Sequence, residues 1–465
     1  MFTLNSLLLK DASWIVTVDR RRRILRDCSI LIEDGLITEV SKDAKGVADT
    51  ELDCKGKLVI PGFVNCHAHI SYGHALRGVL PDEMGRGEYL RSLFGIQRWM
   101  TEEEERSVSL YAMGDLLMSG YTTLLEPGTV NNIRSVTDAA QRSGIRIVCG
   151  THFLDVENPF NIGVSSTSEA RKKSEHTLRR IISLNNRLIT PCVSAFSPMY
   201  CTDELLLSLK ELSESYKVTF TMHLAEDEGS VKRFLESKGK RPVQYLDSKG
   251  ILGGRLLLAH AVFLTNNEVT RLAQSQTRVA FCPSSSVRGS GAGVGSKLPE
   301  MLEKGVVIGL GTDSAVSSYY QDPFRVMYLC SVIFKDGRRD RSLMSPEKMI
   351  EISTIRAAEA LGMNDEVGSI EVGKRADIVV LRMDGPEWTT CFYPPYNLVY
   401  SADKSSVDTV LVDGRVLVKE GIPVTIDMTG LKQEVERVAD TLIKRSGHKI
   451  SHVWKVAPPG ARIRR

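Results

Sequence analysis

The sequence predicts an α/β fold: a TIM-like (β/α)₈ barrel with a small β-sandwich domain built from both ends of the chain. In the middle of the sequence, apolar strand-like runs alternate with helical patterns, as in repeated βα units around a parallel sheet. Both ends instead carry short β-type runs separated by turn signals. The 465 residues, 42% of them hydrophobic, are enough for one large barrel and a smaller companion.

These patterns divide the chain into three expected parts. Residues 1–58 and 366–425 form the composite β-sandwich, residues 59–365 form the barrel, and residues 426–465 form a C-terminal helix and a basic tail. Asp34-Gly35 and Asp413-Gly414 are typical of tight hairpin turns, one in each half of the sandwich. The strands expected in this domain cover residues 14–18, 29–32, 36–40, 367–370, 376–381 and 409–418.

The barrel requires eight strands separated by helices. Its first strand runs into His67 and His69, and the others are expected at 122–125, 146–149, 192–196, 218–222, 256–259, 278–281 and 306–310. Thr101 is suited to cap a helix that begins with Glu102 to Glu105 and ends near Gly120, because hydroxyls and negative charges stabilise helix N-termini. Further helices are expected at 203–216 and 228–238.

Polar side chains stand where several of these strands end. His67 and His69 are two positions apart, so an extended chain presents both imidazoles to one point, as a metal ion requires. Such a pair alone is equally compatible with packing. Active sites of barrels lie at the C-terminal ends of their strands, however, and four strand ends carry metal-type or acid/base residues. These residues are His67, His69, His223, Glu226, His260 and Asp313.

Composition narrows the class of protein. The formal net charge is +3, with 60 basic and 57 acidic residues, which gives no reason to expect a nucleic-acid or membrane partner. The nine cysteines are dispersed and form no Cys-x-x-Cys pair, so a reducing compartment fits. We find no secretory signal and no bilayer-spanning run, and expect a cytoplasmic protein, with a small-molecule partner, that forms a homo-oligomer. The basic stretch from Lys444 is expected to be a solvated tail.

Several motifs in a fixed order resemble the amidohydrolase superfamily, specifically its deaminase and chlorohydrolase branch. They are PGFVNCHAH at 61–69, HALRG at 74–78, HLAE at 223–226, LAH at 258–260, GTDS at 311–314, GKRADIV at 373–379 and NLVY at 397–400. The resemblance covers almost the whole chain. This branch includes deaminases of S-adenosylhomocysteine, methylthioadenosine and 5′-deoxyadenosine, together with cytosine deaminase-like enzymes and triazine hydrolases.

The resemblance implies a metal site with one divalent ion per chain. Its ligands would be His67, His69, His223 and Asp313, a donor set that suits zinc, with iron as the alternative. Residues 192–196 offer no lysine of the kind that bridges two metals in binuclear relatives, which favours one ion.

The resemblance also implies catalytic roles. Asp313 would accept a proton from the attacking water, and His260 would orient that water. Glu226 would protonate the ring nitrogen beside the attacked carbon and help to move a proton to the departing group. A solvated surface role for Glu226 is the alternative.

The substrate is less well defined. Relatives that accept adenosine derivatives bind ribose with a carboxylate in the loop after the first strand, where this chain offers Asp82 and Glu83, with Arg77 nearby. Ser285 lies in a serine-rich segment, 284–286, where relatives carry amides, and its role in substrate binding competes with ordinary turn chemistry. We expect a hydrolytic deaminase of a 5′-modified adenosine. The alternatives are an aminohydrolase or chlorohydrolase of a free base, pterin or triazine, and a non-catalytic metal-binding barrel.

Overall fold

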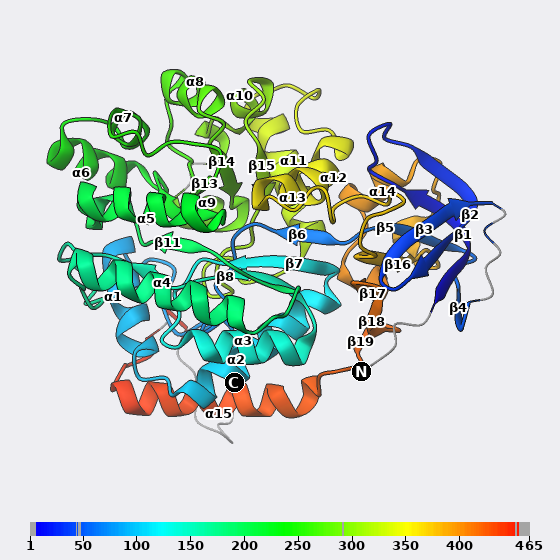
Figure 1. Ribbon diagram of the computed structural model, residues 1–465, viewed down its shortest axis with the longest axis horizontal. Helices are drawn as coiled ribbons and strands as arrows, with labels where there is room; N and C mark the ends of the chain where they lie inside the picture. Colours follow the sequence, from blue (N-terminus) through cyan, green and yellow to red (C-terminus); the bar gives the residue numbers. More distant parts are fainter. Residues whose placement is uncertain (1–5, 43, 45–47, 291–292, 452, 455–465) are drawn as a thin grey trace, which may run out of the picture.

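The computed structural model describes residues 6–42, 44, 48–290, 293–451 and 453–454. It is an α/β structure with one mixed sheet and two parallel sheets (Figure 1). The mixed sheet combines the first strands of the chain with the last, and the parallel sheets come from the middle. The positions of the two kinds of sheet along the chain therefore agree with the sequence prediction, whereas the division into domains stays a prediction.

The mixed sheet contains nine strands in the order β19-β18-β17-β16-β5-β1-β2-β3, with β4 paired to β1. Its strands are β1 (Leu7–Val16), β2 (Ile24–Glu33), β3 (Leu36–Ser41), β4 (Thr50–Asp53), β5 (Lys57–Pro61), β16 (Ile378–Arg382), β17 (Val407–Val412), β18 (Arg415–Lys419) and β19 (Ile422–Pro423). All nine join in one hydrogen-bonded sheet. The strand expected at 367–370 is wrong, because Gly368 has a φ of +92° that interrupts extended backbone there.

The two Asp-Gly turns of this sheet are confirmed, and they touch each other. Asp34, Gly35, Asp413 and Gly414 all have positive φ, as a two-residue hairpin turn of the I′ type requires. A Cβ added to Gly414 would lie 2.6 Å from the Cα of Gly35, so neither turn has room for a larger residue. This contact joins the N-terminal and C-terminal halves of the sheet.

The parallel sheets contain four and six strands, in the orders β10-β8-β7-β6 and β15-β14-β13-β12-β11-β9. The strands are β6 (Phe63–Asn65), β7 (Tyr121–Glu126), β8 (Arg146–Cys149), β9 (His152–Phe153), β10 (Ile189–Pro191), β11 (Val193–Ala195), β12 (Phe220–Leu224), β13 (Leu256–His260), β14 (Arg278–Phe281) and β15 (Ile308–Leu310). All eight expected runs contain strand residues. The runs at 192–196, 218–222 and 306–310 begin one or two residues later than predicted.

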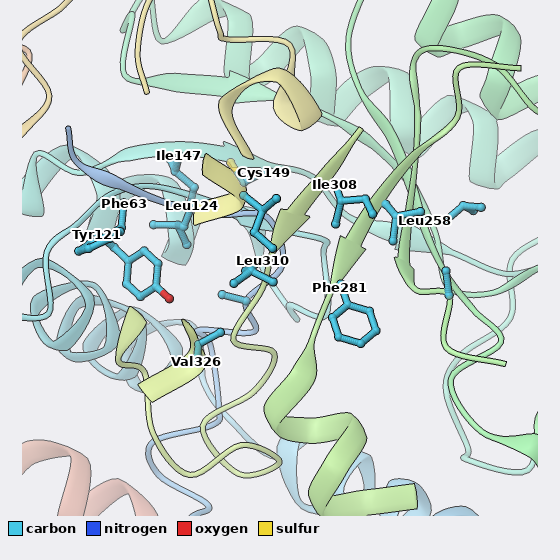
Figure 2. Packing of buried hydrophobic residues seen from close by; sticks show 14 of the residues in the cluster. Phe63, Tyr121, Leu124, Ile147, Cys149, Leu258, Phe281, Ile308, Leu310 and Val326 are labelled. Atoms are coloured by element: carbon cyan, nitrogen blue, oxygen red, sulfur yellow. The ribbon is translucent and has the colours of Figure 1, made fainter. Parts of the chain in front are cut away.

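Hydrogen bonds connect the two parallel sheets at both sides. The Cys192 N–H donates to the Cys149 carbonyl, 2.9 Å away, where β10 continues into β11. The Cys66 N–H, directly after β6, donates to the Leu310 carbonyl of β15, also at 2.9 Å. The first and last strands of the parallel series are therefore neighbours. Side chains of β6 to β8 and β13 to β15 fill the core between them (Figure 2).

Helices follow most of the parallel strands (Figure 1). They are α1 (Arg86–Gln97), α2 (Glu102–Met118), α3 (Ile133–Ser143), α4 (Thr167–Ser183), α5 (Asp203–Tyr216), α6 (Glu228–Lys238), α7 (Pro242–Ser248), α8 (Asn266–Gln274), α9 (Pro283–Ser290), α10 (Leu298–Glu303), α11 (Pro323–Gly337), α12 (Pro346–Ser353), α13 (Ile355–Leu361), α14 (Pro394–Tyr400) and α15 (Met428–Ser446). Short 3₁₀ turns occur at η1 (Pro198–Tyr200), η2 (Gly293–Gly295), η3 (Pro386–Trp388) and η4 (Lys404–Ser406).

Three of these helices test the sequence predictions directly. The helices α5 and α6 have the predicted bounds, 203–216 and 228–238. At the start of α2, the Thr101 side chain accepts the Glu104 N–H at 3.3 Å and the Glu104 carboxylate accepts the Thr101 N–H at 2.8 Å. This reciprocal pair satisfies two backbone donors that the helix itself leaves free, as the predicted cap requires.

The C-terminal helix α15 packs along α2 at the lower edge of Figure 1. Val435, Val438 and Leu442 are buried in a cluster with Val108 of α2. Arg445 pairs with Glu104 at 2.9 Å, so this part of the basic stretch is not simply solvated. Residues 455–465 of the predicted tail lie outside the described part of the chain. Within the described residues, no helix is both long and apolar enough to cross a membrane.

A buried ion pair connects the parallel and mixed sheets. Arg146, the first residue of β8, donates to both carboxylate oxygens of Asp377, each at 3.0 Å. The two side chains are only 2% and 1% exposed. Asp377 precedes β16 and also accepts the Asp413 N–H at 2.8 Å. Because both charges lie away from water, this bidentate pairing is needed to compensate their lost hydration.

Candidate active site

His67 and His69 lie just beyond the end of β6 rather than within it. Their backbone is nevertheless held between two strands, because the Cys66 N–H donates to Leu310 of β15 and the Ala68 N–H donates to Leu125 of β7. The alternate residues, His67 and His69, therefore turn their imidazoles toward the same side. Their ring centroids are 4.7 Å apart, which confirms the expectation that the His-x-His motif brings two rings together.

His223, near the end of β12, completes a group of three histidines. One ring nitrogen from each of His67, His69 and His223 lies within 4.8 Å of the others, and the Nε2 atoms of His69 and His223 are 3.4 Å apart. Burial and the neighbouring imidazoles lower the pKa of His67 and lower the pKa of His223 to about 4. Both rings are therefore neutral at pH 7, which is the form that binds metal ions.

The hydrogen bonds of these rings fit a metal ligand set. The Nδ1–H of His223 donates to the Phe196 carbonyl at 2.7 Å, which leaves the Nε2 lone pair of His223 available. Both nitrogens of His67 are buried without a hydrogen-bond partner among the described residues. A buried polar atom without a partner is costly, and coordination of a divalent ion would satisfy it. The three imidazoles and a nearby carboxylate thus suit zinc.

Asp313 supplies that carboxylate from the segment after β15. Its Oδ1 lies 3.6 Å from the Nε2 of His69, and its backbone N–H donates to the His67 carbonyl at 2.8 Å. Burial alone would raise the pKa of Asp313, but His260, His69 and a hydrogen bond from Ser285 lower it. Asp313 is therefore ionised and faces the histidine group.

Glu226 and His260 lie beside this group, as the sequence predicts. The Nε2 of His260, the last residue of β13, is 3.6 Å from the Oε2 of Glu226. His260 has a φ of +70° and Asp313 a φ of +60°, in the left-handed region that non-glycine residues seldom occupy. Such backbone persists only where the surrounding structure holds it, and it is common at active sites.

Arg86, at the start of α1, is a further charged residue of the site that the sequence analysis did not select. Its guanidinium forms an ion pair with Glu226, and its Nε lies 3.2 Å from Asp227. Burial would raise the pKa of Glu226, but Arg86, with His260 and His223, lowers it to about 2. Glu226 is therefore a carboxylate at neutral pH and is already engaged before any substrate binds.

A cavity of about 120 Å³ opens in front of these side chains. Its walls include His69, His223, Glu226, His260 and Asp313, together with Tyr72, Asp82, Met84, Arg86, Tyr89, Leu90, Leu93, Phe94, Thr129, Phe196, Ser285, Arg288 and Ser317. A second cavity of about 310 Å³ shares Arg86, Leu90, Phe196, His223 and Glu226 with it. Arg86 and Glu226 thus lie where the two cavities meet.

The expected substrate contacts are only partly brought together. Asp82 and Ser285 line the first cavity, but Asp82 forms an ion pair with Arg288, which also donates to the Ser317 carbonyl at 3.0 Å. Glu83 is not among the lining residues. Arg77 is also absent from this wall, because its guanidinium donates to the Ala315 carbonyl at 3.3 Å and lies 3.7 Å from Asp115.

Two buried residues next to the histidines were not predicted from the sequence. Glu126 is the last residue of β7, and Thr129 follows in the next turn and reaches the ring of His69. The rule that selected the other site residues, a polar side chain at a strand end, also applies to Glu126. Nothing in the local sequence marks Thr129 or Arg86, since their roles depend on how their loops return to the site.

Sequence comparisons place this chain among known proteins. The model of the amidohydrolase family matches residues 58–417. A 5′-deoxyadenosine deaminase from Methanothermobacter thermautotrophicus is 32% identical over 408 residues, which cover 85% of this chain and 90% of that protein. A 5-methylthioadenosine/S-adenosylhomocysteine deaminase from Pyrococcus furiosus is 29% identical over 420 residues, which cover 89% of this chain and 94% of that protein.

A structural comparison agrees with these matches. The crystal structure of an adenosine deaminase from Xanthomonas campestris with bound zinc superposes with a TM-score of 0.87. The superposition covers 94% of this chain and 98% of that chain at 21% sequence identity. At this identity, the likeness establishes a shared fold.

Proposed function

This chain belongs to the amidohydrolase family, and we propose that it is a metal-dependent hydrolase that deaminates an amino-substituted N-heterocycle. The favoured substrate is an adenosine modified at its 5′ position, the kind of substrate named for both deaminase relatives. The observation that carries this proposal is the convergence of His67, His69 and His223 on one point beside Asp313 and Glu226.

The metal that we propose for this site is one zinc ion per chain, with iron as the alternative. His67, His69, His223 and Asp313 would hold it, and when bound it would supply a water molecule of lowered pKa as the nucleophile.

The fold that we propose is one (β/α)₈ barrel over 59–365, supported by the hydrogen bonds that join the parallel sheets at both sides. The remaining segments, 1–58 with 366–425, and 426–465, would form the composite domain and the C-terminal helix and tail.

Hydrolytic deamination replaces an exocyclic C–N bond by C=O and releases ammonia. It needs a group that gives a proton to the ring nitrogen beside the attacked carbon and another that takes a proton from water. Asp313, ionised and next to the histidines, is suited to accept that proton. Glu226 is ionised in the free protein, so it must take up a proton before it delivers one to the ring, and it acts as a shuttle.

His260 and Arg86 would assist this shuttle. His260 lies 3.6 Å from Glu226, close enough to orient a water molecule or to stabilise the charge that develops when water adds to the ring. Arg86 forms an ion pair with the Oε2 of Glu226, so a substrate that binds this oxygen would compete with the guanidinium. Asp227, 3.2 Å from the Nε of Arg86, offers it a second partner.

The decisive experiment measures metal content and ammonia release together. The purified protein should contain about one zinc or iron ion per chain and should release ammonia from 5′-deoxyadenosine, 5′-methylthioadenosine or S-adenosylhomocysteine. The His67→Ala, His223→Ala double variant should lose both metal and turnover. Glu226→Gln should keep its metal and lose about 10²-fold or more in kcat, because a positioned proton shuttle contributes that much. His176→Ala, on the exposed face of α4, is the matched control and should retain both.

A second candidate function is hydrolysis of a free base, pterin or triazine. It is favoured by the ion pair between Asp82 and Arg288, which occupies the carboxylate otherwise available for ribose hydroxyls. Ammonia release from guanine, a pterin or an aminotriazine, with none from any adenosine derivative, would select this alternative. A protein that binds zinc and turns over no member of the panel would contradict both and leave the non-catalytic barrel.

A further inference from the structure

Glu126 carries a buried carboxylate directly behind the proposed metal site. It is the last residue of β7 and is 0% exposed. Its Oε1 accepts the backbone N–H groups of Gly128 at 2.9 Å and Thr129 at 3.2 Å. Its Oε2 accepts the backbone N–H of Ile70, the residue after His69, at 2.8 Å. A buried carboxylate needs such partners, and these three tie the end of β7 to the His-x-His segment.

The same carboxylate reaches His69 through a hydroxyl group. The Oγ1 of Thr129 is 3.4 Å from the Oε1 of Glu126 and in hydrogen-bond contact with the Nδ1 of His69. Glu126 itself lies 3.8 Å from that Nδ1. On the opposite side of the ring, the Nε2 of His69 faces the Nε2 of His223 at 3.4 Å and Asp313 at 3.6 Å.

The direction of these hydrogen bonds follows from the chemistry of the groups. The Glu126 carboxylate already accepts three backbone N–H groups, and the Thr129 hydroxyl donates its hydrogen to the Oε1 of the same carboxylate. The hydroxyl oxygen is then left to accept, and the group that faces it is the Nδ1 of His69. This arrangement favours a proton on the Nδ1 of His69, so that its Nε2 is the nitrogen that faces His223 and Asp313.

The backbone of Thr129 is fixed independently of its side chain. The Thr129 carbonyl accepts the Nε2–H of Gln97 at 2.6 Å and the hydroxyl of Ser71 at 3.0 Å. Replacement of the hydroxyl alone should therefore leave the turn in place.

We propose that Glu126 and Thr129 are positioning residues that fix the tautomer and orientation of His69, so that its Nε2 is presented to the metal ion. This inference rests on the metal site of the proposed function and adds to it two residues outside the proposed ligand set. In metal sites generally, the second nitrogen of a histidine ligand donates to a carboxylate, carbonyl or water, and the loss of that partner lowers metal affinity by about 10-fold to 100-fold.

Thr129→Val tests the proposal because valine keeps the shape of threonine and removes the hydroxyl. Zinc affinity, measured by competition with a chromogenic chelator, should fall by about 10-fold to 100-fold. Thr129→Ser restores the hydroxyl and should bind zinc nearly as the wild type does. Thr123→Val is the matched control: Thr123 is buried in β7, the strand that ends at Glu126, and its hydroxyl has no hydrogen-bond partner among the described residues. Its zinc affinity should not change.

A second measurement reads the tautomer directly. In histidine-labelled, metal-free protein at alkaline pH, where the imidazole is neutral, the ¹⁵N chemical shifts of His69 should show a proton on Nδ1 in the wild type and in Thr129→Ser, and lose that signature in Thr129→Val. Unchanged shifts and unchanged zinc affinity in Thr129→Val would overturn the proposal. If the wild-type protein binds no zinc, the proposed function fails, whereas the shifts of His69 still decide this inference.

Discussion

Arg86 at the start of α1 forms an ion pair with Glu226, the residue for which we propose a proton-shuttle role. The pair joins the loop after β6 to the end of β12, and it lies where the two cavities meet. In the free protein, therefore, a guanidinium is paired with the carboxylate that the proposed reaction would use. One consequence of this pairing can be measured through the pH dependence of the activity.

Arg86→Met should move the acidic limb of the kcat/KM profile to higher pH. The pKa of Glu226 is about 2 with Arg86 in place, so the wild-type carboxylate loses its charge only in strong acid. Without the guanidinium, burial raises this pKa, and the fraction of ionised Glu226 falls at mildly acidic pH. We expect a shift of at least about one pH unit, or roughly 1.4 kcal/mol. Arg86→Lys keeps the charge and should shift the limb less. Identical profiles for Arg86→Met and the wild type would contradict this role.

Asp82→Ala should raise KM for a 5′-modified adenosine by at least about tenfold, equivalent to roughly 1.4 kcal/mol. This expectation holds if Asp82 separates from Arg288 when the substrate binds and its carboxylate then accepts hydrogen bonds from the ribose hydroxyls. Glu83→Ala is the natural comparison, since Glu83 follows directly in the chain but does not line the cavity. Metal content should stay unchanged in both. Equal effects of the two variants, measured by steady-state kinetics on the same nucleoside, would show that the position of Asp82 in the wall is irrelevant.

Arg146→Ala should destabilise the protein by roughly 3–5 kcal/mol, because it leaves the carboxylate of Asp377 buried without its charged partner. Denaturant unfolding followed by circular dichroism measures the change. The double variant Arg146→Met, Asp377→Leu removes both charges and should recover much of the loss. Arg179→Ala, from an exposed pair on α4, should leave the midpoint nearly unchanged. A single variant as stable as the wild type would show that the pair contributes little.

Glu105 should make folding stability depend on pH below neutrality. Its carboxyl is 1% exposed, and burial raises its pKa from 4.5 to about 7 although it accepts the N–H groups of Asn131 and Asn132. Between pH 4.5 and 7 the folded state binds a proton that the unfolded state has lost, so stability falls as pH rises through this window and levels off above it. The two pKa values limit the effect to about 3 kcal/mol. Glu105→Gln should abolish this slope in unfolding experiments at several pH values, whereas Glu103→Gln, on the exposed side of α2, should retain it.

The histidines, Asp313 and Glu226 could be predicted because strand periodicity locates strand ends, and parallel strands bring those ends to one face. The same rule also selects Glu126, because this residue stands at the end of β7. Arg86 could not be predicted in this way, since it begins α1 directly after an irregular loop, and its long side chain reaches Glu226 only through the path of that loop. Arg77 illustrates the same difficulty, because it belongs to the same loop and turns to Asp115 instead.

The mixed sheet shows a similar limit. Hairpins with Asp-Gly turns were predictable, because the sequence of the turn sets its own backbone conformation. The pairing of β16 with β5 was not, since it joins segments from opposite ends of the chain. The sequence accordingly indicated β1, β2, β3, β16, β17 and β18 but not β4 or β19. The contact between the two turns, at Gly35 and Gly414, emerged only in three dimensions.

The bond between the Cys66 N–H and the Leu310 carbonyl also bears on the order in which the protein matures. Beside it, the side chains of Asn65 and Thr312, 247 residues apart in sequence, are hydrogen bonded at 2.7 Å. Bringing together residues so far apart in sequence has a large entropy cost of loop closure, so such contacts form late in folding. On the ribosome, His67 and His69 emerge long before Asp313 can join them, so a nascent chain holds only part of the proposed ligand set. Uptake of the proposed metal ion would therefore have to await synthesis of Asp313, and a fragment truncated before β15 should not retain the ion.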